Sequence, residues 1–288
     1  MVLISVVIPF YSSLPGLLKN AVISALNQSV KSIEVIVVDD DSPLSAINEL
    51  KEINDTRLKI LKHSVNSNGG IARNTGIDNA NGKFIAFLDY DDIWYEHKLK
   101  LQLELYNLHC LQSQDDVVVY SRSKIVDGKR TMIRPLRSIA EEESVGEYLF
   151  CAKQIIQTSG IFLETKLAKE VRFDDLKRHQ DYQFCLSLES VGAKFIMLDK
   201  PSYEFIQIPK LNDYDFALFW LNKYSKYLNK PAVKGFKNLV VLRSIISHGK
   251  YFHAFKYAKN ERMLLSFFKS IFFKIIKETI VIFSTNNK

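Results

Sequence analysis

The sequence predicts an α/β fold with a mostly parallel central sheet flanked by helices. Short runs of branched apolar residues alternate with segments whose apolar residues recur at helical spacing. The apolar runs are continuous, as expected for strands that are covered by helices on both faces. Strands and helices in alternation imply right-handed crossovers and parallel neighbours. A basic, helical C-terminal extension is expected to follow this α/β part.

The first strand is predicted at Leu3–Ile8, an apolar run that Pro9 ends. The other predicted strands are Ile33–Val38, Leu58–Leu61, Phe84–Leu88, Val117–Tyr120, a segment near Gly160–Leu163 and a segment near Lys194–Leu198. The predicted helices are Leu14–Leu26, Leu44–Ile53, Ile71–Ala80, Glu96–Cys110, Asp181–Val191 and Leu264–Phe283. A turn is expected at Asp127-Gly128.

Charge divides the chain into two parts. The 288 residues hold 39 Lys and Arg against 32 Asp and Glu, a net charge of +7. Residues 1–210 hold 25 basic and 28 acidic residues, a balance of −3, and residues 211–288 hold 14 and 4, a balance of +10. The basic part therefore predicts an anionic partner, either lipid head groups or nucleic acid. Three scattered cysteines fit neither a disulfide framework nor a zinc site, and they indicate a reducing compartment.

Polar clusters follow three of the predicted strands. An aromatic segment at Tyr11 follows the first strand, acidic residues at 39–41 follow the second, and Asp89, Asp91 and Asp92 follow the strand Phe84–Leu88. The carboxyl ends of parallel strands meet at one edge, where ligands bind. Clustered carboxylates repel one another unless a cation lies among them, and Asp89-x-Asp91 suits a hard divalent ion. The alternative, which we favour only for Asp41 and its neighbour, is that these residues form turns and helix caps.

In order and spacing these motifs resemble an inverting family 2 glycosyltransferase with the GT-A fold, of the kind that builds bacterial surface polysaccharides. The segments that carry the resemblance are SVVIPFYS, SALNQSVKSIEVIVVDDDS, NGGIARNTGIDNANGKFIAFLDYDD, RFDD and HQDYQF, which together cover roughly residues 3–205. The resemblance implies transfer of a hexose from a nucleotide sugar, first of all a UDP-hexose, to a saccharide hydroxyl.

The resemblance also implies roles for individual residues. Asp181 matches the catalytic base, and His179 and Gln180 beside it are weaker candidates for acceptor contacts. The metal ligands are Asp91 and Asp89, with Asp92 as a possible third, and the ion is Mn²⁺ or Mg²⁺. The residues expected to contact the nucleotide are Pro9, Tyr11, Asp39, Asp40, Arg73, Asp89 and Tyr90.

The sequence departs from the family pattern at three positions within or beside these motifs. Ser12 stands where Asn is usual, Asp41 where Gly or Asn is commoner, and Gln180 where Glu normally precedes the base. These differences leave open a second possibility, a nucleotide-sugar-binding protein without catalytic activity. His63 and His97 lie near loop ends without expected partners, and we assign them no role.

The predicted organisation is a catalytic domain at residues 1–210, with 1–115 binding the nucleotide sugar and 116–210 the acceptor, followed by a helical extension at 211–288. In the helix Leu264–Phe283, aromatic residues such as Phe268 share one face, while Lys269 and Lys274 lie on the other face and interrupt the apolar run. This pattern favours a helix lying in the membrane interface over one that spans it. Packing on the catalytic domain is the alternative.

The expected location is therefore cytoplasmic, peripheral on the inner face of the cytoplasmic membrane, where a polyprenyl-diphosphate-linked saccharide would be the acceptor. Lysines interleaved with aromatic residues also suit single-stranded nucleic acid. The acidic balance of residues 1–210 argues against nucleic acid as a partner.

Overall fold

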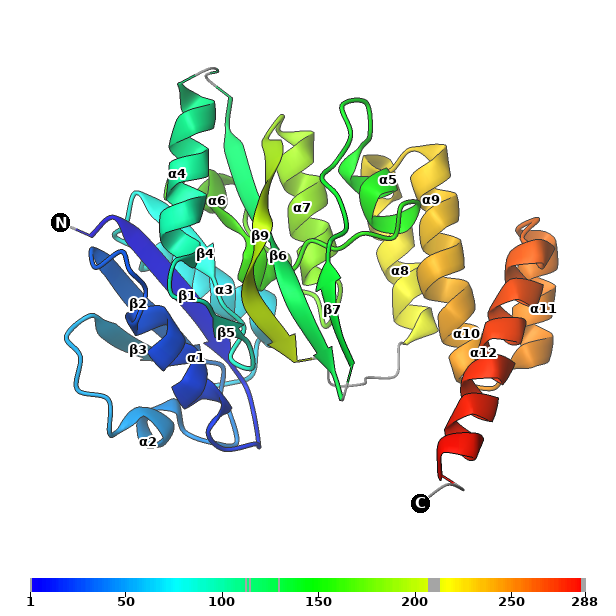
Figure 1. Ribbon diagram of the computed structural model, residues 1–288, viewed down its shortest axis with the longest axis horizontal. Helices are drawn as coiled ribbons and strands as arrows, with labels where there is room; N and C mark the ends of the chain where they lie inside the picture. The colour runs from blue at the N-terminus through cyan, green and yellow to red at the C-terminus, as the bar shows by residue number, and fades with distance from the viewer. Residues whose placement is uncertain (1, 112, 114, 129, 207–212, 286–288) are drawn as a thin grey trace. The chain divides into compact units, whose positions relative to one another are not determined.

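The computed structural model describes the backbone of residues 2–111, 113, 115–128, 130–206 and 213–285, with side chains as far as residue 276. The chain divides into two compact units. The first comprises Met1–Val145 and Gln154–Ile208, and the second comprises Gly146–Lys153 and Pro209–Lys288. We describe each unit by itself (Figure 1).

A nine-stranded sheet forms the centre of the first unit (Figure 1). Its strands are β1 (Ile4–Phe10), β2 (Ile33–Asp39), β3 (Leu58–Lys62), β4 (Phe84–Phe87), β5 (Ile93–Trp94), β6 (Val117–Asp127), β7 (Arg130–Arg134), β8 (Phe162–Glu164) and β9 (Lys194–Ile206). They lie in the order β3–β2–β1–β4–β8–β6–β9–β5, and β7 pairs with β6. The pairs among β1 to β4 are parallel, as is β6 with β9, whereas β5, β7 and β8 pair antiparallel with their neighbours.

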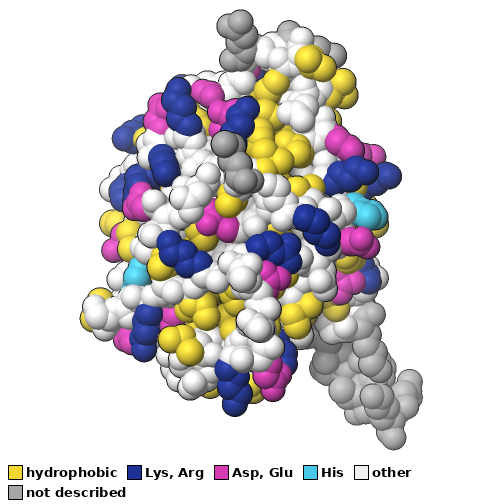
Figure 2. All heavy atoms as spheres, turned by 90° about the vertical axis from the view of Figure 1, so that its left-hand side faces the viewer, with side chains coloured by type: hydrophobic (Ala, Val, Ile, Leu, Met, Phe, Trp, Pro, Cys, Tyr) yellow, Lys and Arg dark blue, Asp and Glu magenta, His cyan; other side chains and the backbone are white. Residues whose placement is uncertain are grey.

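Helices cover both faces of this sheet. They are α1 (Leu17–Leu26), α2 (Ala46–Leu50), α3 (Asn68–Asp78), α4 (Lys98–Cys110), α6 (Thr165–Val171) and α7 (Gln180–Ser190), together with a 3₁₀ turn, η1 (Thr158–Gly160). Over the face of the molecule seen in Figure 2, Lys and Arg side chains are interspersed with Asp and Glu. This mixture agrees with the small net charge of residues 1–210.

The residues of β1 are all buried, as their continuous apolar run predicts. Ile4, Val6 and Ile8 point into one core, which they share with α1 and α4. Val7 points to the other face, toward α3, where a Cβ on Gly76 would lie 2.3 Å from Val7 Cγ1. Only glycine therefore lets α3 pack this closely on the strand. Burying each Val or Ile side chain contributes about 1.5–3 kcal/mol.

The predicted α/β fold is confirmed, with differences at the boundaries. α3 begins at Asn68 rather than Ile71, because both glycines that precede Ile71 take helical conformations. α1 begins at Leu17, since Gly16 before it is left-handed with φ of 81°. β6 and β9 are longer than predicted because they pair with each other over most of their length. The antiparallel strands after β4 make the sheet mixed.

The second unit is helical. Its elements are α5 (Val145–Phe150), whose first residue belongs to the first unit, then α8 (Tyr214–Tyr224), η2 (Ser225–Tyr227), α9 (Lys230–Phe236), the π-helical η3 (Lys237–Leu242), α10 (Arg243–Ser247), α11 (Tyr251–Asn260) and α12 (Leu264–Thr285). Phe150 packs edge-on against Phe236 with ring centroids 5.0 Å apart, and Trp220 stacks on Phe236 at 4.8 Å. The sequence analysis assigned residues 116–210 wholly to the catalytic domain. In the structure, Gly146–Lys153, which lies inside this range, packs with the C-terminal helices, where Phe150 contributes to their core.

The predicted C-terminal helix is present as α12, and the side chains of its residues from 277 on lie outside the described residues. Its inner face packs on α11, where the ring of Phe267 meets Phe255 at 5.6 Å. Lys274 also points inward, because its Nζ donates to Tyr251 Oη at 2.9 Å and to the Ile246 carbonyl at 3.2 Å. The expected division between an aromatic face and a lysine face is therefore wrong for Lys274.

The outer face of α12 is mostly apolar. The large apolar side chains that are more than half exposed along the described part of this helix are Leu265, Phe268, Phe272, Phe273 and Ile275, and the charged Lys269 is also exposed among them. A helix with apolar residues on its packed face and on its open face normally has a second apolar surface against it. Within the described residues, no helix is both long and apolar enough to cross a bilayer.

Candidate active site

Three segments that the sequence analysis singled out leave the sheet at one edge. β1 pairs in parallel with β2 on one side and with β4 on the other. Tyr11, Asp40 and Asp89 follow these three strands, so they lie at the same edge. The Tyr11 side chain is 49% exposed, whereas Pro9 is buried inside β1. The exposed ring of Tyr11 is suited to stack against a nucleotide base.

Asp39 stabilises the turn between β2 and α2. One carboxylate oxygen accepts a hydrogen bond from the backbone N–H of Ser42 at 2.8 Å, and the other from that of Ala46 at 2.9 Å. Both oxygens of this buried side chain are thus used inside the protein. This is the turn and cap role that the sequence analysis gave to the neighbouring Asp41, and the nucleotide contact of Asp39 stays a prediction.

Asp40 is held by a histidine that the sequence analysis set aside. Its Oδ1 lies 2.7 Å from His63 Nδ1 and accepts the backbone N–H of Ser67 at 2.9 Å. The other ring nitrogen of His63 lies 2.9 Å from Thr75 Oγ1 in α3. His63 therefore connects the acid after β2 to α3 and fixes the Asp40 carboxylate, which is almost fully buried.

Arg73 connects Asp89, which follows β4, with Gln180, the first residue of α7. It comes from α3 and is buried, with its Cζ 5.4 Å from the ring centroid of Phe173. One terminal nitrogen donates to Gln180 Oε1 at 2.7 Å, and the other forms an ion pair with Asp89. The planar fork of a guanidinium can hold two partners in this way, which a lysine cannot reproduce. Arg73 thus joins the end of β4 to the start of α7.

The turn η1 forms hydrogen bonds with both the carboxylate and the backbone of Asp89. Thr158 Oγ1 donates to the Asp89 carboxylate, 3.1 Å from each oxygen, and Ser159 Oγ accepts the Asp89 backbone N–H at 3.0 Å. The turn is fixed in its own right, because the Gln102 amide of α4 donates to the Gly160 carbonyl at 2.7 Å. The Asp89 carboxylate is therefore held by Arg73 on one side and by η1 on the other.

The residues that follow Asp89 differ in exposure. Asp91 is partly exposed, while Asp92 is fully buried, and among the described residues neither of its carboxyl oxygens has a hydrogen-bond partner. Burial, followed by the charge of Asp89, raises the pKa of Asp92 well above 3.8. A fully buried carboxyl group does not reach a cation at an open edge, so the geometry does not favour Asp92 as a metal ligand. Burial also raises the pKa of Tyr90, whose ring meets Phe10 at 5.6 Å.

Asp181 lies in the first turn of α7. Its pKa is raised to about 6, mainly by burial with a smaller contribution from the charge of Asp89, against the opposing effects of the Tyr182 backbone N–H and Arg73. A carboxylate of this pKa is a stronger base than an ordinary Asp and is still ionised at neutral pH. Asp181 as a whole residue remains partly exposed, so the site contains a base that an acceptor hydroxyl can approach.

The two weaker candidates flank this base. His179 is left-handed with φ of 60° and stacks on Tyr182, with ring centroids 5.1 Å apart. Burial lowers the pKa of His179 to about 4, so the ring is neutral at pH 7. Gln180 accepts from Arg73 and donates to the Leu176 carbonyl, so its amide is used within the site. Acceptor contacts by either residue stay predictions.

Asp89 and Asp91 fit a divalent cation by the chemistry of their oxygens. Within the described residues, no group of three His, Cys, Asp or Glu side chains converges as a ligand set. An ion there would thus have one or two protein carboxylates and would need further oxygens from a diphosphate and from water. This arrangement is common for Mg²⁺, which often keeps several water ligands and binds through substrate phosphates.

Residues 5–170 match the family model described as Glycosyl transferase family 2. The chain belongs to this glycosyltransferase family. It is 35% identical over 248 residues to the amylovoran biosynthesis glycosyltransferase AmsB of Erwinia amylovora, an alignment that covers 81% of each chain. It is also 30% identical over 195 residues to WfaP of Escherichia coli, named as a UDP-Glc:alpha-D-GlcNAc-diphosphoundecaprenol beta-1,3-glucosyltransferase, over 67% of this chain and 73% of WfaP.

The fold of this glycosyltransferase matches solved structures. The crystal structure of S. aureus TarS 1-349 in complex with UDP-GlcNAc superposes with a TM-score of 0.65 at 20% identity, and the match covers 93% of this chain and 81% of that one. The likeness confirms the predicted GT-A architecture.

Two parts of the glycosyltransferase site were missed by sequence analysis. His63 directly follows β3, at the same sheet edge as Asp40, so its position after a predicted strand was the signal that could have identified it. Thr158 and Ser159 lie 69 and 70 residues from Asp89 along the chain, in a segment without a regular pattern. No local signal indicates their contact with Asp89.

Proposed function

We propose that this family 2 glycosyltransferase transfers a hexose, with inversion, from a UDP-hexose to a hydroxyl of a lipid-diphosphate-linked saccharide during bacterial surface polysaccharide biosynthesis. The names of AmsB and WfaP support the pathway and the acceptor class. The UDP-GlcNAc complex of TarS supports the uridine nucleotide. The particular sugar and the acceptor hydroxyl are not part of the proposal.

One observation carries the catalytic part of this proposal. Arg73 contacts both Asp89, on the expected donor side, and Gln180, the residue before the expected base. The Arg73 and Asp89 charges both act on the pKa of Asp181. The donor-side acid and the base are therefore parts of one electrostatic cluster, as a single transfer reaction requires.

In the proposed reaction, different residues activate the acceptor and bind the nucleotide. Asp181 takes the proton from the acceptor hydroxyl as its oxygen attacks the anomeric carbon of the donor. The bond from that carbon to the diphosphate breaks at the same time, the configuration inverts, and the nucleoside diphosphate leaves. Asp40 and Tyr11 hold the base of the nucleotide. A single displacement forms no covalent intermediate, so a second catalytic carboxylate is not required.

A divalent cation belongs to this proposal. Asp91 and Asp89 would hold it, and when bound it supplies positive charge to the departing diphosphate. Arg73 holds the Asp89 carboxylate in place for this role.

Removal of the metal tests the activity and its cofactor together. Transfer of labelled hexose from UDP-hexoses to a GlcNAc-diphosphate-lipid should proceed with Mn²⁺ or Mg²⁺, fall at least tenfold with EDTA and return when Mn²⁺ is added in excess. Full transfer in EDTA would contradict the metal site. Binding of UDP-hexose without transfer or hydrolysis, with acceptors of several sugars, would favour the non-catalytic alternative.

The second unit fits a membrane surface. Residues 211–288 carry a balance of +10, which complements anionic head groups. The outer face of α12 offers aromatic and aliphatic side chains that are mostly exposed, among them Phe268 and Phe272. A helix that lies in the interface buries such a face among the lipids. This location would bring the enzyme to a lipid-linked acceptor.

Replacing two exposed rings tests the membrane association. Phe268→Gln with Phe272→Gln should lower the partition coefficient onto anionic vesicles by about tenfold or more, because each buried ring is worth about 1.5–3 kcal/mol. Co-sedimentation measures the bound fraction. The matched control, Leu108→Gln with Leu111→Gln, removes two exposed apolar side chains from the α4 region and should bind as the wild type does. Equal binding by both variants would refute the role of α12.

A further inference from the structure

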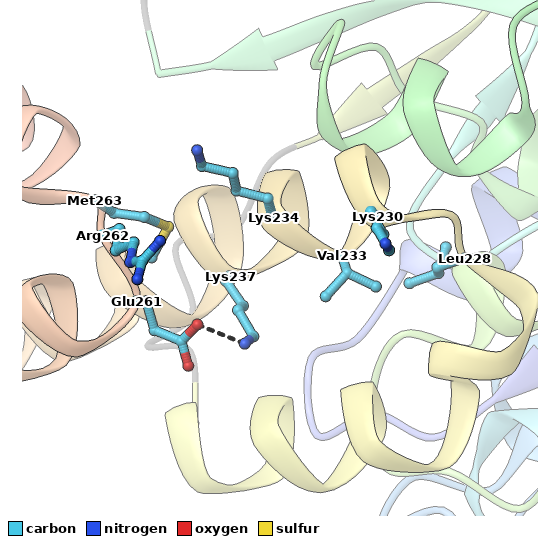
Figure 3. A pocket seen from close by; sticks show the side chains of 8 residues that line it. All are labelled: Leu228, Lys230, Val233, Lys234, Lys237, Glu261, Arg262 and Met263. Carbon is cyan, nitrogen blue, oxygen red and sulfur yellow. Dashed lines mark hydrogen bonds and ion pairs between the residues drawn. The ribbon is translucent and has the colours of Figure 1, made fainter.

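A basic hollow lies in the second unit, apart from the residues of the catalytic cluster. Its volume is about 330 Å³, and it lies between the α9–η3 segment and the turn that joins α11 to α12 (Figure 3). The residues that line it are Leu228, Lys230, Val233, Lys234, Lys237, Glu261, Arg262 and Met263. A volume in this range is enough for a small ligand group.

Four of the lining residues are cationic and one is acidic. Lys230, Lys234 and Lys237 recur at spacings of four and three residues, so their backbone positions lie along one side of the α9–η3 helix, from which the side chains of Lys234 and Lys237 extend in different directions (Figure 3). Lys237 Nζ lies 2.6 Å from Glu261 Oε2, so the one carboxylate is already paired (Figure 3). Among the described residues, no carboxylate pairs with the side chains of Lys230, Lys234 or Arg262. Like charges at this spacing repel, and an anion in the hollow would offset their repulsion.

Arg262 occupies a position that favours another residue type. It follows α11 with φ of 56°, in the left-handed region where helices usually end with glycine. The Met263 N–H donates to the Ala258 carbonyl at 2.7 Å, so the turn is a normal helix end. An arginine here costs backbone strain that a glycine would avoid. The guanidinium, with its fork of donors, is well suited to phosphate oxygens.

The apolar residues beside the cations of the hollow indicate which kind of molecule would contain the bound phosphate. Leu228, Val233 and Met263 line the hollow beside the cations. α12 begins at Leu264, directly after Met263, and its outer face is mostly apolar. The same two helices, α11 and α12, border a second groove of about 400 Å³, which is lined by Tyr251, Phe267, Phe268, Ile271, Lys274 and Ile275. Cations for a phosphate and apolar surface for hydrocarbon therefore come from neighbouring segments of one unit.

We propose that this hollow binds the phosphate of a membrane lipid head group. Lys230, Lys234 and Arg262 bind the phosphate oxygens, and the apolar face of α12 lies among the acyl chains. The proposal rests on the membrane association proposed above, to which it adds a specific site for one phosphate group. It differs from a diffuse attraction between a basic surface and an anionic membrane, because three particular cations should matter more than others.

The test compares two sets of charge removals on vesicles of phosphatidylglycerol mixed with phosphatidylcholine. The hollow variant is Lys230→Gln, Lys234→Gln and Arg262→Gly. The control is Lys153→Gln, Lys226→Gln and Arg243→Gln, which removes three exposed charges of the same unit outside the hollow. Co-sedimentation should show vesicle binding by the hollow variant at least tenfold weaker than by the control.

Equal weakening of both variants would overturn the phosphate site and leave the general membrane association standing. No binding of the wild-type chain to these vesicles would overturn both. Transfer to a lipid-free saccharide acceptor should be the same in all three proteins, which separates this proposal from the catalytic one. The Arg262→Gly variant alone should have an equal or higher Tm than the wild type while it binds vesicles more weakly, because glycine relieves the left-handed strain. A lower Tm with unchanged binding would refute the role of Arg262.

Discussion

Asp181→Asn should lower kcat for hexose transfer by about a thousandfold, because a positioned general base contributes roughly 10²–10⁴-fold to such a step. The amide keeps the shape of the side chain but cannot accept the acceptor's proton. Binding of UDP to the variant, measured by calorimetry, should be unchanged, since the base contacts the acceptor. A variant with more than a tenth of wild-type kcat would refute the role of Asp181.

The pH dependence follows from the raised pKa of this group. The active form is the carboxylate, so kcat/KM of the wild type should fall as the pH drops below about 6, the pKa of Asp181. The residual activity of Asp181→Asn should not follow this titration. Asp175→Asn is a suitable control, because this exposed carboxylate lies just before the same helix and bonds only to Asn68 among the contacts described. Its activity and pH profile should match those of the wild type.

Stability should change in the opposite direction to activity. A carboxyl group whose pKa is raised from 3.8 to about 6 on folding destabilises the folded state above pH 6, where the group is ionised despite its burial. The Asn variant avoids this cost, so its free energy of unfolding at pH 8 should exceed that of the wild type by up to about 3 kcal/mol. The difference should disappear as the pH falls below about 4, where the wild-type group is protonated in both states. Thermal unfolding at pH 8 and pH 4 measures both.

Arg73→Met should reduce both activity and stability. It leaves Asp89 without its cation and Gln180 without its donor, and the loss of one partner from a buried pair typically costs about 3–5 kcal/mol. Because the Asp89 side chain keeps 31% exposure, we expect the lower end of this range. Urea unfolding measures the cost. The transfer rate should fall at least a hundredfold in conditions where the variant is folded.

A pH profile distinguishes a catalytic effect of Arg73 from simple loss of structure. Arg73 lowers the pKa of Asp181, so residual activity of Arg73→Met should be lost at a higher pH than wild-type activity. Arg73→Lys keeps the charge and should keep the wild-type profile with reduced kcat. Arg172→Met removes a surface ion pair with Asp78 and should cost at most about 1 kcal/mol. An unshifted profile in Arg73→Met would contradict the electrostatic coupling.

The sequence predicts the residues of the site that follow regular elements. Asp40 and Asp89 follow apolar strands and Asp181 opens a predicted helix, so local pattern and topology together indicate their common edge. Thr158 was not predicted, because its contact with Asp89 depends on the antiparallel pairing of β8 with β4. This pairing brings η1, which precedes β8, next to the residues that follow β4. The burial of Asp92 and the inward direction of Lys274 are likewise results of tertiary packing, which periodicity does not encode.

The segment Gly146–Lys153 has a consequence for how the two units can be separated. It leaves the first unit, contributes Phe150 to the aromatic core of the second, and returns. A chain cut at residue 208 would keep Phe150 but lose the rings of Trp220 and Phe236 that cover it. The C-terminal helices are therefore no detachable module added to the end of an enzyme. The second unit becomes complete only when the middle and the end of the chain meet, so it cannot be expressed as a complete unit from the end of the chain alone.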